Sequence, residues 1–492
     1  KSIRCTQQAW QSLSCVVRRH LLLMRPINKR QGTVQVSLQK RVWGWMAFDW
    51  ATQPFYTLLL TFIFGPYFAA VAAQYFLETG LPEVQADANA QSLWSLGQTL
   101  IGLAIAFTAP VLGAFADSSG RRMPWIFAFS VLYVGGTCGI WFLMPDGMFL
   151  WGALISFGIA MIGAEYALIF VNAILPSLGD DKEVGRISGS GAAFGYWGGV
   201  VSLFAMLLFF AENETGKTLI GLDPMFGLDA AARQGTRFVG PFTALWYLVF
   251  MIPFFMWVRE APGHKAASAS ISAAFRDLGT TLKSVVRRRS LAAFLASSMF
   301  YRDALNALYG FGGVYATLVL NWSIIQIGVF GIVGAVTAAI VTFIGGRADR
   351  AFGPKPVIAF MICVLIAVCT VIVGMSREQI FGVPLPVGSA LPDIVFYICG
   401  AAIGGAGGAL YSASRSMMVR HANPARPTEA FGLFALSGKA TSFLAPALIG
   451  MVTYATGSAR LGISPVIVLF VIGLILLRWV HPKGDKAEWF ES

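Results

Sequence analysis

The chain has 492 residues, of which 56% are hydrophobic and only 12% are charged, and its mean hydropathy is +0.67. This composition excludes an ordinary soluble globular protein and indicates a protein that crosses a membrane many times. The formal net charge of +12 does not indicate a nucleic-acid partner, because the basic residues are not gathered on a soluble domain.

The chain opens with a polar segment, residues 1–42, that we expect to be a cytoplasmic tail. Residues 1–23 have neither the uninterrupted apolar core nor the cleavage site of a secretory signal. Because the sequence starts on Lys1 and its first methionine is Met24, we expect translation to begin at Met24.

Twelve stretches then follow that are long and apolar enough to cross a bilayer, which takes about 20 helical residues. The predicted spans are residues 43–72, 92–116, 123–143, 149–175, 191–211, 238–258, 291–318, 324–346, 356–375, 392–414, 430–454 and 464–480. The longest internal loop, 259–290, divides them six and six, and we expect it to be a cytoplasmic linker with an amphipathic helix on the membrane surface. The fold class is therefore all-α: an N-terminal six-helix half (43–258), a C-terminal half (291–480) and a tail (481–492).

The positions of the basic residues predict which way the spans face. Loops on one side of the membrane hold only five Lys or Arg residues: Lys217, Arg233, Arg237, Arg377 and Arg460. The other Lys and Arg residues outside the spans belong to the two tails and to the loops of the opposite side. Since cytoplasmic loops retain positive charge, both termini are predicted to be cytoplasmic, in a bacterial inner membrane.

A short motif occurs at the same place in both halves. After the second span the chain reads GAFADSSGRR, with Gly113, Asp117, Gly120, Arg121 and Arg122, and after the eighth it reads GGRADRAFGPK, with Gly345, Asp349, Arg350 and Gly353. Two copies in register indicate an internal repeat. Glycines allow close helix approach, and an acid beside basic groups can form ion pairs that break and re-form. We predict that these loops are conformational switches.

The repeated loop resembles the signature loop of the major facilitator superfamily, whose two halves rock about a central site. Three blocks, FDWATQPFYTLLLTFIFGPYF (48–68), NAILPSLGDDKEVGRISGSGAAFGYWGG (172–199) and EAFGLFALSGKATSFLAPALIG (429–450), more closely resemble the unknown-major-facilitator family, relatives of the autophagy-related vacuolar effluxers. The resemblance covers residues 42–479. It implies two pseudo-symmetric six-helix bundles and solute transport, and in the fungal vacuolar members the implied cargo is amino acids.

Charged residues inside spans are candidates for function, because each costs about 2.5 to 3.5 kcal/mol near the bilayer centre. Five charged residues lie well inside a span, away from its ends: Asp49, Glu165, Arg302, Asp303 and Lys439. In the superfamily the first, fourth, seventh and tenth helices line the cavity, and the resemblance therefore implies that all but Lys439 surround it. Neighbouring polar candidates for the substrate site are Gln53, Asn172 and, on the tenth helix, Tyr411.

Two hypotheses explain these charges. In the first, Glu165 or Asp303 takes up and releases a proton while Arg302 or Lys439 binds an anionic group of the cargo, since a carboxylate removed from water holds a proton more readily. In the second, Arg302 or Lys439 only neutralises one of the acids and so holds helices together.

The sequence thus predicts a monomeric, proton-coupled secondary transporter of a small polar solute, with amino acids as candidate cargo. A drug or metabolite exporter, a lipid translocator and a signalling pseudo-transporter are the alternatives. The sequence does not favour a membrane-embedded enzyme, because it has no recognisable nucleophile motif and no histidine within the spans. The partners expected are the solute, protons and the lipid bilayer, with no nucleic acid, cofactor or metal.

Overall fold

The computed structural model describes residues 36–485 except 120, 214, 260–278, 280–282, 284, 286, 321, 323 and 457. Most of the N-terminal tail with Met24, most of the predicted linker and its amphipathic helix, Gly120 and the end of the C-terminal tail therefore lie outside the described residues. The remainder is helical apart from its loops and one short hairpin.

Residues 38–257 form the first group of helices. They are α2 (Leu38–Pro54), the π-helix η1 (Phe55–Phe62), α3 (Phe64–Glu78), α4 (Glu83–Ser119), α5 (Met123–Gly139), η2 (Ile140–Phe142), α6 (Leu150–Asn172), η3 (Leu175–Ser177), α7 (Asp181–Phe209), η4 (Met225–Gly227), α8 (Gln234–Arg237), α9 (Val239–Phe250) and α10 (Ile252–Trp257).

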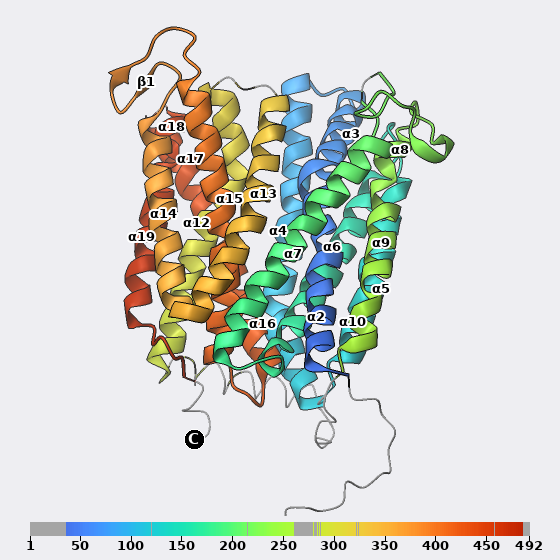
Figure 1. Ribbon diagram of the computed structural model, residues 1–492. Helices are drawn as coiled ribbons and strands as arrows, with labels where there is room; N and C mark the ends of the chain where they lie inside the picture. Colours follow the sequence, from blue (N-terminus) through green and yellow to red (C-terminus); the bar gives the residue numbers. More distant parts are fainter. Residues whose placement is uncertain are drawn as a thin grey trace, which may run out of the picture. The chain divides into compact units, whose positions relative to one another are not determined.

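Residues 289–479 form the second group, which lies beside the first (Figure 1). Its elements are α12 (Arg289–Leu320), α13 (Ile324–Phe352), α14 (Pro354–Gly374), α15 (Leu391–His421), α16 (Pro427–Ala440), α17 (Leu444–Thr456), α18 (Ala459–Gly462), α19 (Ser464–Leu476) and η5 (Leu477–Trp479), with an antiparallel hairpin of β1 (Gln379–Ile380) and β2 (Val383–Pro384).

Eleven helical segments in the described part are long and apolar enough to cross a membrane. The predicted seventh span, 291–318, is not among them, although the 32-residue helix α12 occupies its place. Its middle carries Arg302, Asp303 and Asn306, and these side chains lower the hydropathy of the helix. A helix of 32 residues is about 48 Å long, which is enough to span a bilayer.

The first predicted span is interrupted at its centre, between α2 and α3. Pro54 has no N–H, so the carbonyl of Trp50, four residues earlier, loses its helical donor. The indole Nε1 of Trp246 donates to that carbonyl oxygen at 3.1 Å. The chain then continues as the eight-residue π-helix η1, a form that often occurs at functional sites.

Two spans extend at least seven residues beyond their predicted bounds at the end of the bundle where Asp117 and Asp349 lie, which we call the aspartate end. Helix α7 begins at Asp181 rather than at residue 191, and the side chain of Asp180 caps it by accepting from the N–H groups of Lys182 and Glu183. Helix α15 continues to His421 rather than ending at residue 414, so Arg415 lies within the helix.

Close glycine contacts join the two groups of helices. On α7, a Cβ added at Gly189 would collide with the Cα of Gly346 on α13. On α16, a Cβ at Gly432 would lie 2.8 Å from the carbonyl oxygen of Ala109 on α4. The backbones can approach this closely only because side chains are missing at these crossings. These two crossings form the seam between the groups.

Candidate functional site

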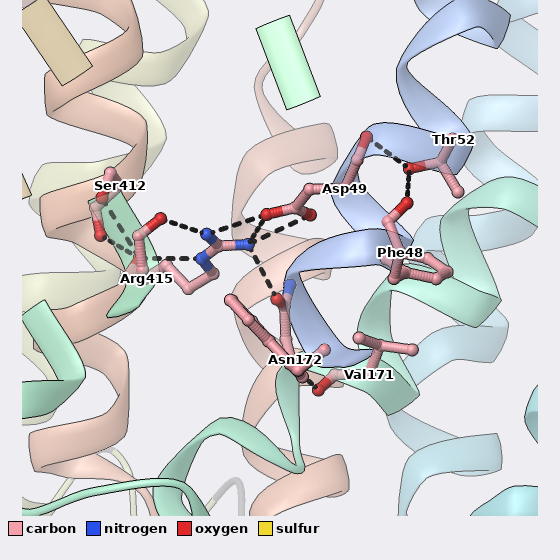
Figure 2. A network of polar contacts seen from close by, with 9 residues as sticks. Phe48, Asp49, Thr52, Val171, Asn172, Ser412 and Arg415 are labelled. Atoms are coloured by element: carbon pink, nitrogen blue, oxygen red, sulfur yellow. Dashed lines mark hydrogen bonds and ion pairs between the residues drawn. The ribbon is translucent and has the colours of Figure 1, made fainter. Parts of the chain in front are cut away.

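An ion pair between Arg415 on α15 and Asp49 on α2 crosses the seam (Figure 2). Nη1 and Nη2 of Arg415 each lie 3.2 Å from Oδ2 of Asp49, and Nη1 also donates to Oδ1 of Asn172 on α6 at 3.3 Å. The side chain of Arg415 is 1% exposed and that of Asp49 is 12% exposed. One arginine of the second group therefore binds a carboxylate and a side-chain amide of the first.

The remaining guanidinium donors of Arg415 are also satisfied. Nε donates to Ser188 Oγ at 2.9 Å and Nη2 to the Ser188 carbonyl oxygen at 2.7 Å, both on α7. The guanidinium lies 4.7 Å from the centre of the Trp45 ring and 5.7 Å from that of Tyr411, which adds cation–π attraction. The guanidinium can be buried here only because the opposite charge and the hydrogen bonds replace the water molecules that would otherwise hydrate it.

Sequence reasoning missed Arg415 because it counted this residue among the topogenic loop arginines. A signal was available in the run YSASRSMMVRH, which continues the small and apolar pattern of the tenth span past residue 414. The partner of Arg415 could not be identified from this signal, since α15 and α2 are far apart in the chain.

A second pair of opposite charges crosses the seam between Lys439 on α16 and Glu165 on α6. Lys439 Nζ lies 3.6 Å from Glu165 Oε1, and the two side chains are 26% and 15% exposed. A nitrogen and an oxygen at this separation attract each other without a good hydrogen bond. This pair is therefore looser and more accessible than the pair of Arg415 with Asp49.

The other predicted candidates have different surroundings. Arg302 pairs with neither predicted acid, and its Nη1 donates to the carbonyl oxygen of Phe434 at 2.8 Å. Asp303 is 1% exposed and accepts the N–H of Ala445 at Oδ2, 2.9 Å away. Gln53 lies against α7, where a Cβ at Gly199 would come within 2.9 Å of its Cγ.

At the aspartate end, Asp117 at the end of α4 contacts the first turn of α16. Its Oδ1 accepts from Thr428 Oγ1 at 2.6 Å and lies 3.0 Å from Arg122 Nη2, and its Oδ2 accepts the N–H of Glu429 at 2.8 Å. A carboxylate at a helix N-terminus satisfies free N–H groups and complements the helix dipole. On the preceding turn of α4, a Cβ at Gly113 would lie 2.7 Å from the Thr428 carbonyl oxygen.

The second copy of the motif makes the related contact with α7. The carboxylate of Asp349, at the end of α13, is so close to Gly185 that a Cβ there would collide with it. Asp349 is fully buried and lies 3.9 Å from Arg420 Nη2, and neither of its oxygens has a hydrogen-bond partner among the described residues. The next residue, Arg350, pairs with Glu183 of α7 at 2.8 Å.

The other motif residues lie at the aspartate end or just inside it. Gly345 contacts α15, since a Cβ there would lie 2.8 Å from the Ala409 Cβ. Gly353 has φ +86° and links α13 to α14, a backbone form that favours glycine. Arg121 is exposed at the start of the loop to α5. Both copies of the motif thus connect one group of helices to the first turns of a helix in the other.

Comparison with known proteins identifies the family. The family model described as vacuole effluxer Atg22 like matches residues 37–488. The chain belongs to this family. The Atg22-like chain is 26% identical over 452 residues to an uncharacterized MFS-type transporter, YxiO, of Bacillus subtilis, and the match covers 90% of this chain and 95% of YxiO.

Fungal relatives match over a shorter stretch. Autophagy-related protein 22-2 of Neosartorya fischeri is 26% identical over 320 residues, which cover 62% of this chain and 50% of the fungal protein. The match with the fungal relatives thus spans about half of their length.

Solved structures confirm the fold. The human organic anion transporter MFSD10 aligns with a TM-score of 0.65 at 16% identity, covering 90% of this chain and all of that one. The fucose:proton symporter FucP of E. coli aligns with a TM-score of 0.60 at 15% identity, over 89% and 98% of the two chains. The Atg22-like chain has the major facilitator fold, with two pseudo-symmetric helix bundles in an integral membrane protein. It is a transporter-family protein and not an enzyme.

Proposed function

We propose that this Atg22-like chain is a proton-coupled secondary transporter that moves a small polar solute by alternating access, with amino acids as the first candidates. The observation that carries the proposal is the loose, partly exposed pair of Glu165 and Lys439 across the seam. A solute with both a carboxylate and an ammonium group matches the two charges, its carboxylate on Lys439 and its ammonium on Glu165. The pair with Arg415 is too buried and too fully bonded for such an exchange.

The same pair supports proton coupling. Protonation of Glu165 would remove its attraction for Lys439, and this attraction links α6 of one group to α16 of the other. A proton would thus weaken one of the ion pairs across the seam and favour separation of the two groups. Asp49 with Arg415 and the two aspartate-end contacts would then break and re-form as the groups rock.

We also propose that the protein works as a monomer in a bacterial inner membrane, with the aspartate end and both termini in the cytoplasm. The distribution of basic residues supports this orientation. Arg415 no longer counts toward it, because it lies inside α15, but the other basic residues of the tails and loops still do.

The test begins with a thermal-shift screen of the purified protein against amino acids, sugars and nucleosides at two pH values. A solute at 100 times its Kd should stabilise the folded protein by about 2.7 kcal/mol. If no solute raises the unfolding temperature, the solute class is wrong, and a lipid translocator or pseudo-transporter becomes the better proposal.

The identified solute is then followed in proteoliposomes. Glu165→Gln should lose accumulation driven by a pH gradient and keep a weakened exchange of labelled for unlabelled solute, because its amide oxygen can still accept from the cargo's ammonium group. Lys439→Gln should lose both because it removes the cargo's anion site. Glu78→Gln is the matched control, since Glu78 is exposed at the end of α3. Gradient-driven accumulation by Glu165→Gln at the wild-type level would reject the coupling role.

A further inference from the structure

The predicted eleventh span is broken in the membrane-spanning region. Helix α16 ends at Ala440 and α17 begins at Leu444, with a three-residue turn between them. At such a break the last carbonyls of one helix and the first N–H groups of the next lack α-helical partners, and turn bonds such as that from the Ser442 N–H to the Lys439 carbonyl oxygen replace some of them. Such groups must find other partners where water is scarce.

Two consecutive residues of α12 contact the helices on either side of this break. Arg302 donates to the carbonyl oxygen of Phe434 in α16 at 2.8 Å, and its guanidinium lies 4.4 Å from the centre of the Phe434 ring. Asp303 accepts the N–H of Ala445, the second residue of α17, at 2.9 Å. A cation near the C-terminus of one helix and an anion at the N-terminus of the next both complement the helix dipoles.

Further contacts show that α12 fits the end of α16 closely. The guanidinium of Arg302 lies directly on Gly438, where a Cβ would collide with it. Thr441 Oγ1, in the turn, donates to the Met299 carbonyl oxygen of α12 at 3.2 Å. Between these two contacts lies Lys439, in the last turn of α16, which reaches across the seam to Glu165.

We propose that Arg302 and Asp303 form a clamp that sets the angle between α16 and α17 and thereby positions Lys439 against Glu165. They are positioning residues rather than cargo ligands. The importance of Lys439 rests on the proposed function, but the clamp itself does not. In the clamp, Asp303 acts through an oxygen that accepts the Ala445 N–H, so asparagine, an uncharged acceptor, can replace it. If Asp303 carried the proton, asparagine could not replace it.

The angle is measured as a distance between spin labels at Ala425→Cys, before α16, and Tyr454→Cys, on α17, in a chain without its other cysteines. Both sites are exposed, Tyr454 by 93%. Asp303→Ala and Gly438→Val should each shift or broaden this distance, because one removes the acceptor and the other displaces Arg302. Asp303→Asn should keep the wild-type distance because its amide oxygen can still accept.

An unchanged distance in both Asp303→Ala and Gly438→Val would overturn the clamp, and so would a distance in Asp303→Asn that matches Asp303→Ala. If Gly438→Val does not fold, Arg302→Gln takes its place. The measurement needs no solute, so it stands apart from the transport assay. Where solute is available, Asp303→Ala should raise KM at least tenfold, whereas Asp303→Asn should have the wild-type KM. If Asp303→Asn keeps the wild-type label distance but loses uptake driven by a pH gradient, Asp303 carries the proton and is not only a positioning residue.

Discussion

Replacement of Arg415 by glutamine should open the seam at the aspartate end. Glutamine removes the charge that neutralises Asp49, and it cannot serve Asn172 and both oxygens of Ser188 at once. Because Arg415 and Asp49 belong to different groups of helices, the loss destabilises the closed seam and not either group by itself. Separation of the groups would allow water to reach Asp49.

The magnitude follows from the burial of the pair, with Arg415 1% and Asp49 12% exposed. Removing one partner of a buried ion pair costs about 3 to 5 kcal/mol, and each 1.4 kcal/mol changes an equilibrium about tenfold. The ratio of closed to open seam should therefore fall by about two to three and a half powers of ten. Asp49→Asn should also shift the ratio toward the open seam, because it leaves the buried charge of Arg415 without a counter-charge.

The assay is a spin-label distance between Lys182→Cys at the start of α7 and Phe352→Cys at the end of α13. Both side chains are exposed, Phe352 by 75%, and the two positions belong to different groups of helices. Arg415→Gln should move most of the population to a longer distance, and Arg415→Lys should lie between it and the wild type, because lysine keeps the charge but not the fork of donors. The same distance distribution in wild type and Arg415→Gln would refute the reasoning.

Two more predictions follow from single contacts. Gly189→Leu should force α7 away from α13 and lengthen the same label distance, whereas Gly135→Leu should not, because no atom lies within 4 Å of an added Cβ there. Trp246→Phe should lower the free energy of unfolding by about 0.5 to 1.5 kcal/mol, since the carbonyl of Trp50 loses its donor. In chemical unfolding, Trp151→Phe, at a residue 57% exposed, is the control, and equal effects of the two changes would contradict this role.

Much of the architecture could be predicted from local sequence. Hydrophobic length locates most of the spans, because a helix in lipid must satisfy its own backbone and cover it with apolar side chains. The repeated motif with Asp117 and Asp349 indicates two related halves, which the solved structures confirm. The one span that hydropathy alone fails to identify in the structure, α12, carries the polar residues of the clamp.

The pairing of the charges depended on the tertiary structure. Sequence reasoning identified Glu165, Lys439, Arg302 and Asp303 as costly intramembrane charges and left open which of them neutralise one another. The structure pairs Lys439 with Glu165 and directs Arg302 and Asp303 to the backbone of a broken helix. A break in α16–α17 can be stabilised by residues far away in sequence, so local propensity could not indicate its partners.

The sequence by itself determined that this chain spans a membrane, where most of its spans lie, and that a charged motif repeats in both halves, because these properties depend on residues close together in the chain. Only the tertiary structure decided that Arg415 is a buried partner of Asp49 rather than a loop arginine. The physical reason is that a buried charge is defined by the groups that replace its water, and here those groups come from three other helices, α2, α6 and α7.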